Sequence, residues 1–197
     1  TKSVCSAICS RLEKLFDSPE FTSRKLVVGG GVAGIAAALS AARAGRALGL
    51  KTEVILLERG FMLGGLATAG LVTYFLPLCD GKGHQVSFGI CEELIRLSDS
   101  LGTDEAIPDV WCDPATSVED RAQKRFRNRY HPNVFAIQCE QLLVKEGIEI
   151  LYGTRVAEVQ MKGNKISHLI LENKSGRTAL QVGSVVDATG DSDVCAF

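Results

Sequence analysis

A glycine cluster between a short apolar run and a long run of small residues constrains the fold of this chain more than any other feature. The segment reads KLVVGGGVAGIAAALSAARAG from Lys25 to Gly45, and Gly29, Gly31 and Gly34 satisfy the pattern GxGxxG. In that pattern the first glycine permits a tight turn, the second lets the backbone approach a pyrophosphate, and the third lets a helix pack closely on a strand. A plain strand-to-helix turn fits the same letters, so the residues that follow must discriminate.

The residues on both sides of the glycines predict a strand, a helix and a second strand. Residues 24–28 form a short β-rich run, and residues 34–43 are almost all small or apolar, which suits a helix pressed against a sheet. Residues 52–57, TEVILL, form the continuous apolar run typical of a buried parallel strand. The sequence therefore predicts a βαβ unit with a right-handed crossover.

An acidic residue at the end of the second strand points to a dinucleotide. Glu58 follows TEVILL directly, where a carboxylate can accept hydrogen bonds from both hydroxyls of an adenosine ribose. An acid at this place disfavours a 2′-phosphate, and therefore NADP. The helix that begins near Val32 offers free N–H groups and the positive end of its dipole to the phosphates. A surface glutamate after a strand remains the alternative, and NAD and FAD fit these residues equally well.

The second half of the chain changes from helical patterns to alternating ones. Periodicity and apolar runs predict helices over residues 88–98, 118–127 and 134–146 and a strand over residues 148–152, with an otherwise irregular stretch between 98 and 131. From Val156 apolar and polar residues alternate, and turn signals stand at residues 162–164 and 173–176, which predicts a three-stranded antiparallel meander. A buried strand is expected at Ser184–Asp187. The fold class is α/β.

Charge and cysteine usage exclude several classes of partner. The formal net charge is -1, so no nucleic acid is expected. No apolar run reaches the roughly 18 residues of a membrane span. The seven cysteines stand at irregular spacing, which favours a reducing compartment, the cytoplasm, over a disulfide framework. Cys5 and Cys9 form the only close pair and lack further ligands, so no metal is predicted.

Three motifs in order carry a resemblance to a known family. The segments VVGGGVAGIAAALSAARAG, VILLERGFMLGGLATAGLVTYF and VVDATGDSDVCA resemble the FAD-dependent oxidoreductases of the glutathione-reductase-type fold. The match is to a bacterial branch with ER-x-x-x-x-GG after the second strand and DATGD-x-D after the meander, and it covers nearly the whole chain from Arg24. It implies a Rossmann-like parallel sheet with flanking helices plus the meander, FAD as cofactor, and a redox reaction on a small organic substrate.

The resemblance also implies which residues bind FAD. The first glycine turn would hold the pyrophosphate, Glu58 the ribose, Arg59 would lie beside the adenosine, and a second glycine loop would follow the pyrophosphate and ribityl chain. The implied cofactor residues are Gly29, Gly31, Val32, Ala33, Gly34, Glu58, Arg59, Gly64, Gly65, Leu66, Ala67, Val156, Ala188, Thr189, Gly190 and Asp191. A helix N-cap is an equally good interpretation of Asp191.

Family members are generally longer, so we expect this chain to be an N-terminal part of a longer protein. Residues 1–22 predict an amphipathic helix, and residues 23–197 the FAD-binding domain with residues 67–132 partly a substrate-side insertion. Catalytic residues remain unassigned. Weak candidates are the acid/base groups Tyr74, Asp80 and His84 and the thiol Cys79, each with a structural alternative. A homo-oligomer is compatible with the sequence. The alternative functions are a non-catalytic dinucleotide-binding module and an NAD-consuming protein similar to thiazole synthases.

Overall fold

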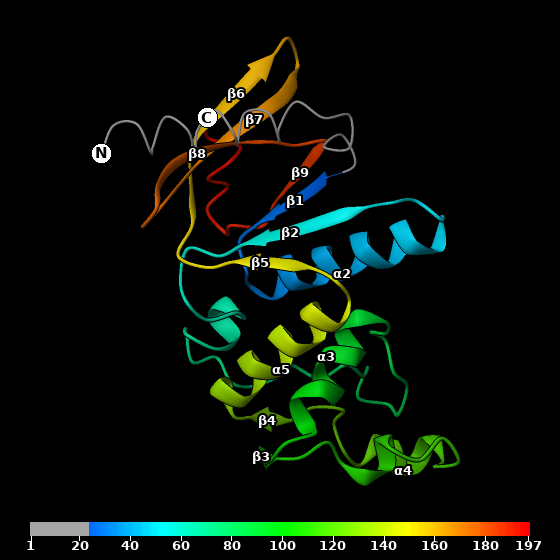
Figure 1. Ribbon diagram of the computed structural model, residues 1–197. Coiled ribbons are helices and arrows are strands. Elements are labelled where there is room, and N and C mark those ends of the chain that lie inside the picture. Colours follow the sequence, from blue (N-terminus) through cyan, green and yellow to red (C-terminus); the bar gives the residue numbers. More distant parts are fainter. Residues whose placement is uncertain (1–23) are drawn as a thin grey trace. The chain divides into compact units, whose positions relative to one another are not determined.

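The chain folds into two compact units. The computed structural model describes residues 24–197, so the predicted helix over residues 1–22 and the pair Cys5 and Cys9 lie outside the described residues. Of these residues, the first unit contains those from Arg24 to Phe61 together with Glu146–Phe197, and the second contains Met62–Lys145. Figure 1 labels the elements of both units. Across residues 24–197, none of the helices combines the length and the apolar character that crossing a membrane requires.

A four-stranded parallel sheet forms the centre of the first unit. Its order is β5-β2-β1-β9, made by the strands β1 (Arg24–Val28), β2 (Glu53–Leu57), β5 (Glu149–Leu151) and β9 (Ser184–Asp187). Helix α2 (Val32–Ala47) connects β1 to β2, which confirms the predicted βαβ unit. The register pairs Val28 with Leu57 on one side and with Asp187 on the other. The three strands therefore end at the same edge of the sheet.

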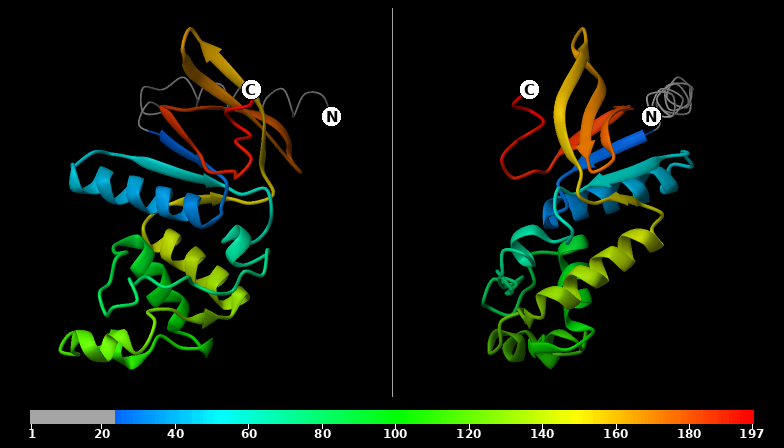
Figure 2. Two further views of the ribbon diagram at one scale, coloured as in Figure 1. Left: turned by 180° about the vertical axis from the view of Figure 1, so that it is seen from behind. Right: turned by 60° about the vertical axis from the view of Figure 1, so that its left-hand side comes forward.

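The predicted meander is present and covers one face of this sheet. It consists of β6 (Arg155–Lys162), β7 (Lys165–Asn173) and β8 (Gly176–Gln181), paired antiparallel in that order. Figures 1 and 2 show the meander on one face of the parallel sheet and α2 on the other. Side chains alternate between the two faces of a strand. The sheet is consequently buried on both sides, as its apolar sequence predicts.

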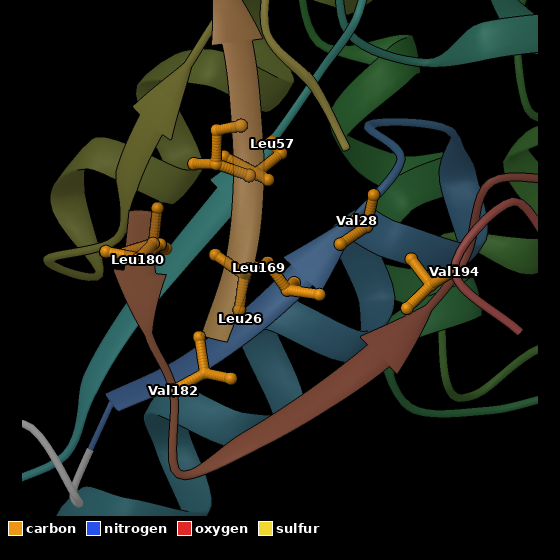
Figure 3. Close-up of a cluster of buried hydrophobic side chains, with 9 residues drawn as sticks. Leu26, Val28, Leu57, Leu169, Leu180, Val182 and Val194 are labelled. Carbon is orange, nitrogen blue, oxygen red and sulfur yellow. The ribbon is translucent and has the colours of Figure 1, made fainter. Parts of the chain in front are cut away.

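The core between sheet and meander is a single apolar cluster. Leu26, Val28 and Leu57 reach it from the parallel sheet, and Leu169 and Leu180 reach it from the meander (Figure 3). Leu169 is fully buried. Close packing of aliphatic side chains from both layers holds the meander against the sheet, because each buried side chain of this size contributes about 1.5–3 kcal/mol.

The second unit is built from short elements around aromatic side chains. Its elements are the 3₁₀ turns η2 (Gly65–Ala67) and η3 (Asp109–Trp111), helices α3 (Ile90–Asp99), α4 (Val118–Ala122) and α5 (Pro132–Lys145), and strands β3 (Thr103–Glu105) and β4 (Arg129–Tyr130). The rings of Trp111 and Phe126 stack at 5.1 Å. The three predicted helices are present, although α4 ends before the predicted residue 127. Strands β3 and β4 were not predicted, because two or three residues are too few to show an alternating pattern.

Truncating Leu169 tests the contact between the two layers. We expect Leu169→Ala to lower the free energy of unfolding by about 2–5 kcal/mol, because it leaves a cavity in the shared core. The matched control is Leu48→Ala at the end of α2, where the side chain is 72% exposed and the expected change is within about 0.5 kcal/mol. Urea unfolding followed by circular dichroism gives both values. Equal losses in the two variants would show that the meander is not held by this core.

Candidate functional site

Three strand ends converge at one edge of the parallel sheet in the first unit. Gly29 follows β1, Glu58 follows β2, and Ala188 follows β9. The amide of Gly29 donates to the carbonyl oxygen of Leu57 at 2.8 Å, and the amide of Ala188 donates to the carbonyl oxygen of Val28 at 2.8 Å. These bonds extend the sheet by one residue. They hold the three predicted segments together before each chain turns away.

Two of the three motif glycines are required by close backbone approach. Gly29 has φ +102°, and a Cβ at this residue would lie 2.4 Å from the carbonyl oxygen of Ala188. A Cβ on Gly34 would lie 1.8 Å from the carbonyl oxygen of Gly29. Neither position can accept a side chain without a shift of backbone. The Ala188–Thr189–Gly190 segment is thus brought against the first turn, as the sequence predicted.

Gly31 differs from the other two because nothing fills the space beside it. Its φ is −67°, which any residue can adopt, and a Cβ placed there would meet nothing within 4 Å. Gly31 is also the N-cap of α2, and it makes no side-chain capping bond. The first N–H groups of a helix have no partner within the helix, and the dipole makes this end positive. The start of α2 at Val32 and Ala33 therefore has the geometry and the charge to receive an anion.

The carboxylate of Glu58 lies at the glycine turn, as predicted. Its Oε2 accepts a hydrogen bond from the amide of Gly30 at 2.8 Å, and its Oε1 accepts one from the amide of Gly60 at 2.6 Å. The side chain is half-buried. Two bonds from opposite sides fix the carboxylate, and each oxygen keeps a further lone pair for a hydroxyl donor.

An open pocket lies beside Arg59, the residue after Glu58, in the same unit. It has a volume of about 290 Å³ and is lined by Arg59, Gly153, Arg155, Glu172, Asn173 and Lys174. Arg155 pairs with Glu172 at 3.2 Å, which leaves the pocket with an excess of positive charge. Val156, one of the predicted cofactor residues, stands opposite Leu171 in the meander and packs partly buried on the core.

Asp187, which the sequence analysis did not single out, organises the turn after β9. Its Oδ1 accepts bonds from the amide and the hydroxyl of Thr189 at 3.1 and 2.8 Å, and its Oδ2 accepts bonds from the amides of Val194 and Cys195 at 2.9 and 3.0 Å. Burial by itself raises the pKa of Asp187, but the bonds from Thr189 and Cys195 outweigh it and lower the pKa. An aspartate two residues before a threonine is the sequence signal for such a turn.

The N-cap interpretation of Asp191 is wrong. The residues that follow it form a turn and no helix, and Ser192 has φ +59°. The side chain of Asp191 is exposed. Because Asp187 already accepts the amides of Val194 and Cys195, the capping role predicted for Asp191 is performed four residues earlier.

The second glycine loop belongs to the second unit. Gly64 and Gly65 adopt φ values of +103° and +55°, and the loop continues into the 3₁₀ turn of Leu66 and Ala67. A Cβ on Gly64 would lie 2.4 Å from Cγ2 of Thr68. The left-handed backbone at Gly64 and Gly65 explains the GG pair.

The weak catalytic candidates do not form one constellation. Asp80 and His84 are exposed, with Oδ2 and Nδ1 3.2 Å apart, and the amide of Lys82 is the main cause that lowers the pKa of Asp80. The hydroxyl of Tyr74 accepts a bond from Arg127. Cys79 is buried, and its Sγ accepts from the amide of Phe126 at 3.3 Å, so its role here is structural. Within residues 24–197, no group of three His, Cys, Asp or Glu side chains could hold a metal.

Comparisons with known proteins bear on the same residues. Residues 26–197 match the family model described as FAD dependent oxidoreductase. Among curated proteins no sequence matches this chain.

Similar solved structures share the fold at low sequence identity. THI4 of Thermovibrio ammonificans aligns over 95% of this chain and 62% of its own, with 16% identity and TM-score 0.54. A flavoprotein/dehydrogenase of Cytophaga hutchinsonii aligns over 87% and 40%, with 14% identity and TM-score 0.53. The myxobacterial chondrochloren halogenase CndH, a variant of FAD-dependent halogenases, aligns over 84% and 37%, with 17% identity and TM-score 0.55. The chain thus spans less than two thirds of the length of these proteins.

Two alanine substitutions distinguish the role of Gly29, which the turn requires, from that of Gly31, beside which the space is open. We expect Gly29→Ala to lower the free energy of unfolding by about 2–5 kcal/mol, because it combines a disfavoured φ with a backbone overlap. Gly31→Ala should lower it by no more than about 1 kcal/mol, because its Cβ enters open space and only the preference for glycine over alanine at the N-cap is lost. Thermal and urea unfolding measure both. A large loss from Gly31→Ala would show that this space is filled by the protein itself.

Replacing Asp187 tests the turn after β9. In Asp187→Asn an amide NH₂ faces two backbone N–H donors, so we expect a loss of about 1–3 kcal/mol near pH 7. Because the folded pKa is lowered, the contribution of the wild-type carboxylate is present above the unfolded pKa of about 3.9 and is lost as the pH falls through the folded pKa. Urea unfolding at several values from pH 7 to pH 3 should therefore show the two proteins converging in acid. A constant difference would contradict the assignment.

Proposed function

The chain belongs to the family of FAD-dependent oxidoreductases, and on this premise we propose that its first unit binds the ADP half of FAD in a protein that oxidises or reduces a small organic substrate. One observation supports this proposal most strongly. The carboxylate of Glu58 accepts a hydrogen bond from the amide of Gly30, and the next residue, Gly31, has open space where a Cβ would stand. When bound, the flavin supplies the hydride and electron chemistry, and the protein supplies binding, orientation and charge.

Each part of the first glycine turn suits one part of ADP. The N-terminus of α2 at Val32 and Ala33 carries positive charge and bare N–H groups for the pyrophosphate. The backbone at Gly31 can be approached closely because nothing lies within 4 Å of a Cβ there. The lone pairs of Glu58 accept the two ribose hydroxyls. The residues present therefore fit the cofactor that the family implies.

The adenine would occupy the pocket beside Arg59. Its volume of about 290 Å³ accommodates a flat base, and the guanidinium of Arg59 can stack on such a base. Val156 would contribute backbone contacts. The segment from Ala188 to Asp191 would close the first turn. Residues 64–67, which belong to the second unit, stay predicted cofactor residues.

The branch of the family, the cellular compartment and the class of substrate are proposed from sequence motifs, cysteine usage and family chemistry. The ER-x-x-x-x-GG and DATGD-x-D segments support the bacterial branch named above. Five free cysteines among residues 24–197, two of them buried, support a reducing compartment and hence the cytoplasm. A small organic molecule is proposed as the substrate, because the flavin chemistry of the family acts on such molecules.

FAD binding by the purified chain is the direct test. We expect flavin absorbance after purification or after addition of FAD. Gly31→Val should raise the dissociation constant for FAD at least about tenfold, because an isopropyl group fills the approach to the phosphates, and it should lower the free energy of unfolding by only about 1 kcal/mol. Glu58→Ala should weaken FAD binding by a similar factor. Isothermal titration measures the constants. The matched control is Ala179→Val, which adds similar bulk at an exposed position of β8.

Four outcomes would count against this function. A colourless chain that does not bind added FAD contradicts it, and so does unchanged affinity in Gly31→Val. Release of nicotinamide from added NAD would instead support the NAD-consuming alternative. Tight FAD binding without any reduction of the flavin by candidate substrates would support the non-catalytic module.

A further inference from the structure

Positive charge in the second unit is concentrated in one segment. Five of the eight Lys and Arg residues of Met62–Lys145 stand between residues 121 and 129, and residues 121–131 include no Asp or Glu. The unit as a whole contains eleven Asp and Glu residues, so the rest of it is acidic. An all-basic segment in an otherwise acidic unit creates a local positive potential that can attract an anionic partner.

Side chains in this segment alternate between the inside and the outside of the unit. The buried side chains are those of Phe126, Asn128 and Tyr130. The side chains between them, which reach the surface, are those of Arg125, Arg127 and Arg129. Backbone bonds hold the segment in place, because the amide of Phe75 donates to the carbonyl oxygen of Asn128 at 3.2 Å and that of Leu78 to the carbonyl oxygen of Phe126 at 2.9 Å. The three arginines therefore share the outer side of one supported segment.

The buried side chains anchor the backbone that carries the arginines. The side-chain amide of Asn128 donates to Oγ of Ser98 at 2.9 Å. The ring of Tyr130 packs on that of Phe135 with centroids 4.8 Å apart, and Phe126 is fully buried. A backbone fixed in this way is ordered before a ligand arrives, which lowers the entropic cost of binding.

Two of the three outward guanidiniums are available to a carboxylate. Arg127 is engaged, because it pairs with Glu105 at 3.0 Å, donates to the hydroxyl of Tyr74 and lies over the ring of that tyrosine at 5.3 Å. Within residues 24–197, neither Arg125 nor Arg129 has an ion-pair partner. Both side chains are exposed. The segment thus presents positive charge on either side of a neutralised centre.

A glycine and an occupied carboxylate keep Arg125 in this state. A Cβ on Gly81 would overlap the guanidinium of Arg125, so the missing side chain leaves the space in which that guanidinium lies. The carboxylate of Asp80, next to Gly81, is used within its own turn. Its Oδ1 accepts the amides of Lys82 at 2.7 Å and His84 at 3.1 Å. Arg125 is therefore held at the surface with its charge uncompensated.

We propose that Arg125, Arg127 and Arg129 form a docking surface for an acidic segment of a partner protein. The planar fork of a guanidinium matches a carboxylate, and the pair of Arg127 with Glu105 shows this chemistry inside the chain. Arginine and tyrosine are also the side chains that dominate protein interfaces. Because the outward arginines stand two residues apart, an extended partner with carboxylates at every second residue has the matching period.

An acidic protein segment fits this surface better than a nucleic acid does. A nucleic acid carries its negative charge over a long distance, so it would also meet the acidic remainder of the unit. A short acidic segment meets the arginines alone. The inference concerns the second unit only, and it holds whether or not the first unit binds FAD.

The test measures binding of a fluorescein-labelled peptide in which glutamate and serine alternate. We expect saturable binding to the purified chain by fluorescence anisotropy, and weaker binding when the ionic strength rises from about 0.05 M to about 0.2 M. The double variant Arg125→Gln with Arg129→Gln should raise the dissociation constant roughly tenfold. The matched control, Lys162→Gln with Lys165→Gln, removes the same charge from exposed positions of the first unit and should leave the constant unchanged.

Replacing Glu105 gives a readout of opposite sign. Glu105→Gln removes the carboxylate that occupies Arg127, so the acidic peptide should bind about two- to fivefold more tightly. The side chains of Glu105, Arg125 and Arg129 are all exposed, so we expect these variants to keep the melting temperature of the wild type.

Several results would overturn the inference. The acidic peptide could fail to bind, or it could bind the Arg125 and Arg129 double variant as tightly as the wild type. A peptide of alternating glutamine and serine that binds equally well would show that charge is not recognised. A labelled oligodeoxynucleotide that binds more tightly than the acidic peptide, and is lost in the same double variant, would assign the surface to nucleic acid instead.

Discussion

The site depends on three parallel strands that end at one level of the sheet. Because Val28 is in register with Leu57 and Asp187, the residues that follow the strands emerge side by side. The backbones of Gly29 and Ala188 then approach so closely that no side chain fits between them. At the N-cap of α2 the space is open, because no atom lies within 4 Å of a Cβ placed on Gly31. Open space is needed before charge can act, because the positive end of a helix binds an anion only where no other group covers its free N–H groups.

A positive group and a negative group lie next to each other along this edge of the sheet. The positive end of α2 and the negative carboxylate of Glu58 are joined through a single amide, that of Gly30. Such a carboxylate would repel a phosphate placed against it, but it accepts hydrogen bonds from neutral hydroxyl groups. An elongated ligand with an anionic middle and a hydroxyl-bearing sugar matches this order of charges. The same order disfavours a ligand that carries a phosphate on that sugar, because two anions would then share one place.

The sequence predicted the elements whose patterns are long and missed those set by contacts. The βαβ unit and the meander were predicted because each strand has five or more residues with a recognisable pattern. The pattern is a continuous apolar run in the βαβ unit and an alternation of apolar and polar residues in the meander. Strands β3 and β4 were too short to leave a pattern. At the site, Gly29, Gly34 and Glu58 lie where the motif predicts, since local spacing encodes them. Asp187 was missed because the motif directs attention to its second aspartate, whereas the first accepts the amides.

The position of β9 in the sheet has a consequence for how the protein is made. This strand is the neighbour of β1, yet it follows all the other strands of residues 24–197 along the chain and leaves the ribosome after them. Until β9 pairs with β1, one side of β1 is an unpaired edge, and the backbone of Ala188 does not yet pack against the glycine turn. The glycine turn is therefore completed only after residues 184–188 have been synthesised, by a pairing between distant segments that forms slowly. Nascent chains must protect that edge in the meantime, and a nucleotide can act as a ligand only of the finished sheet.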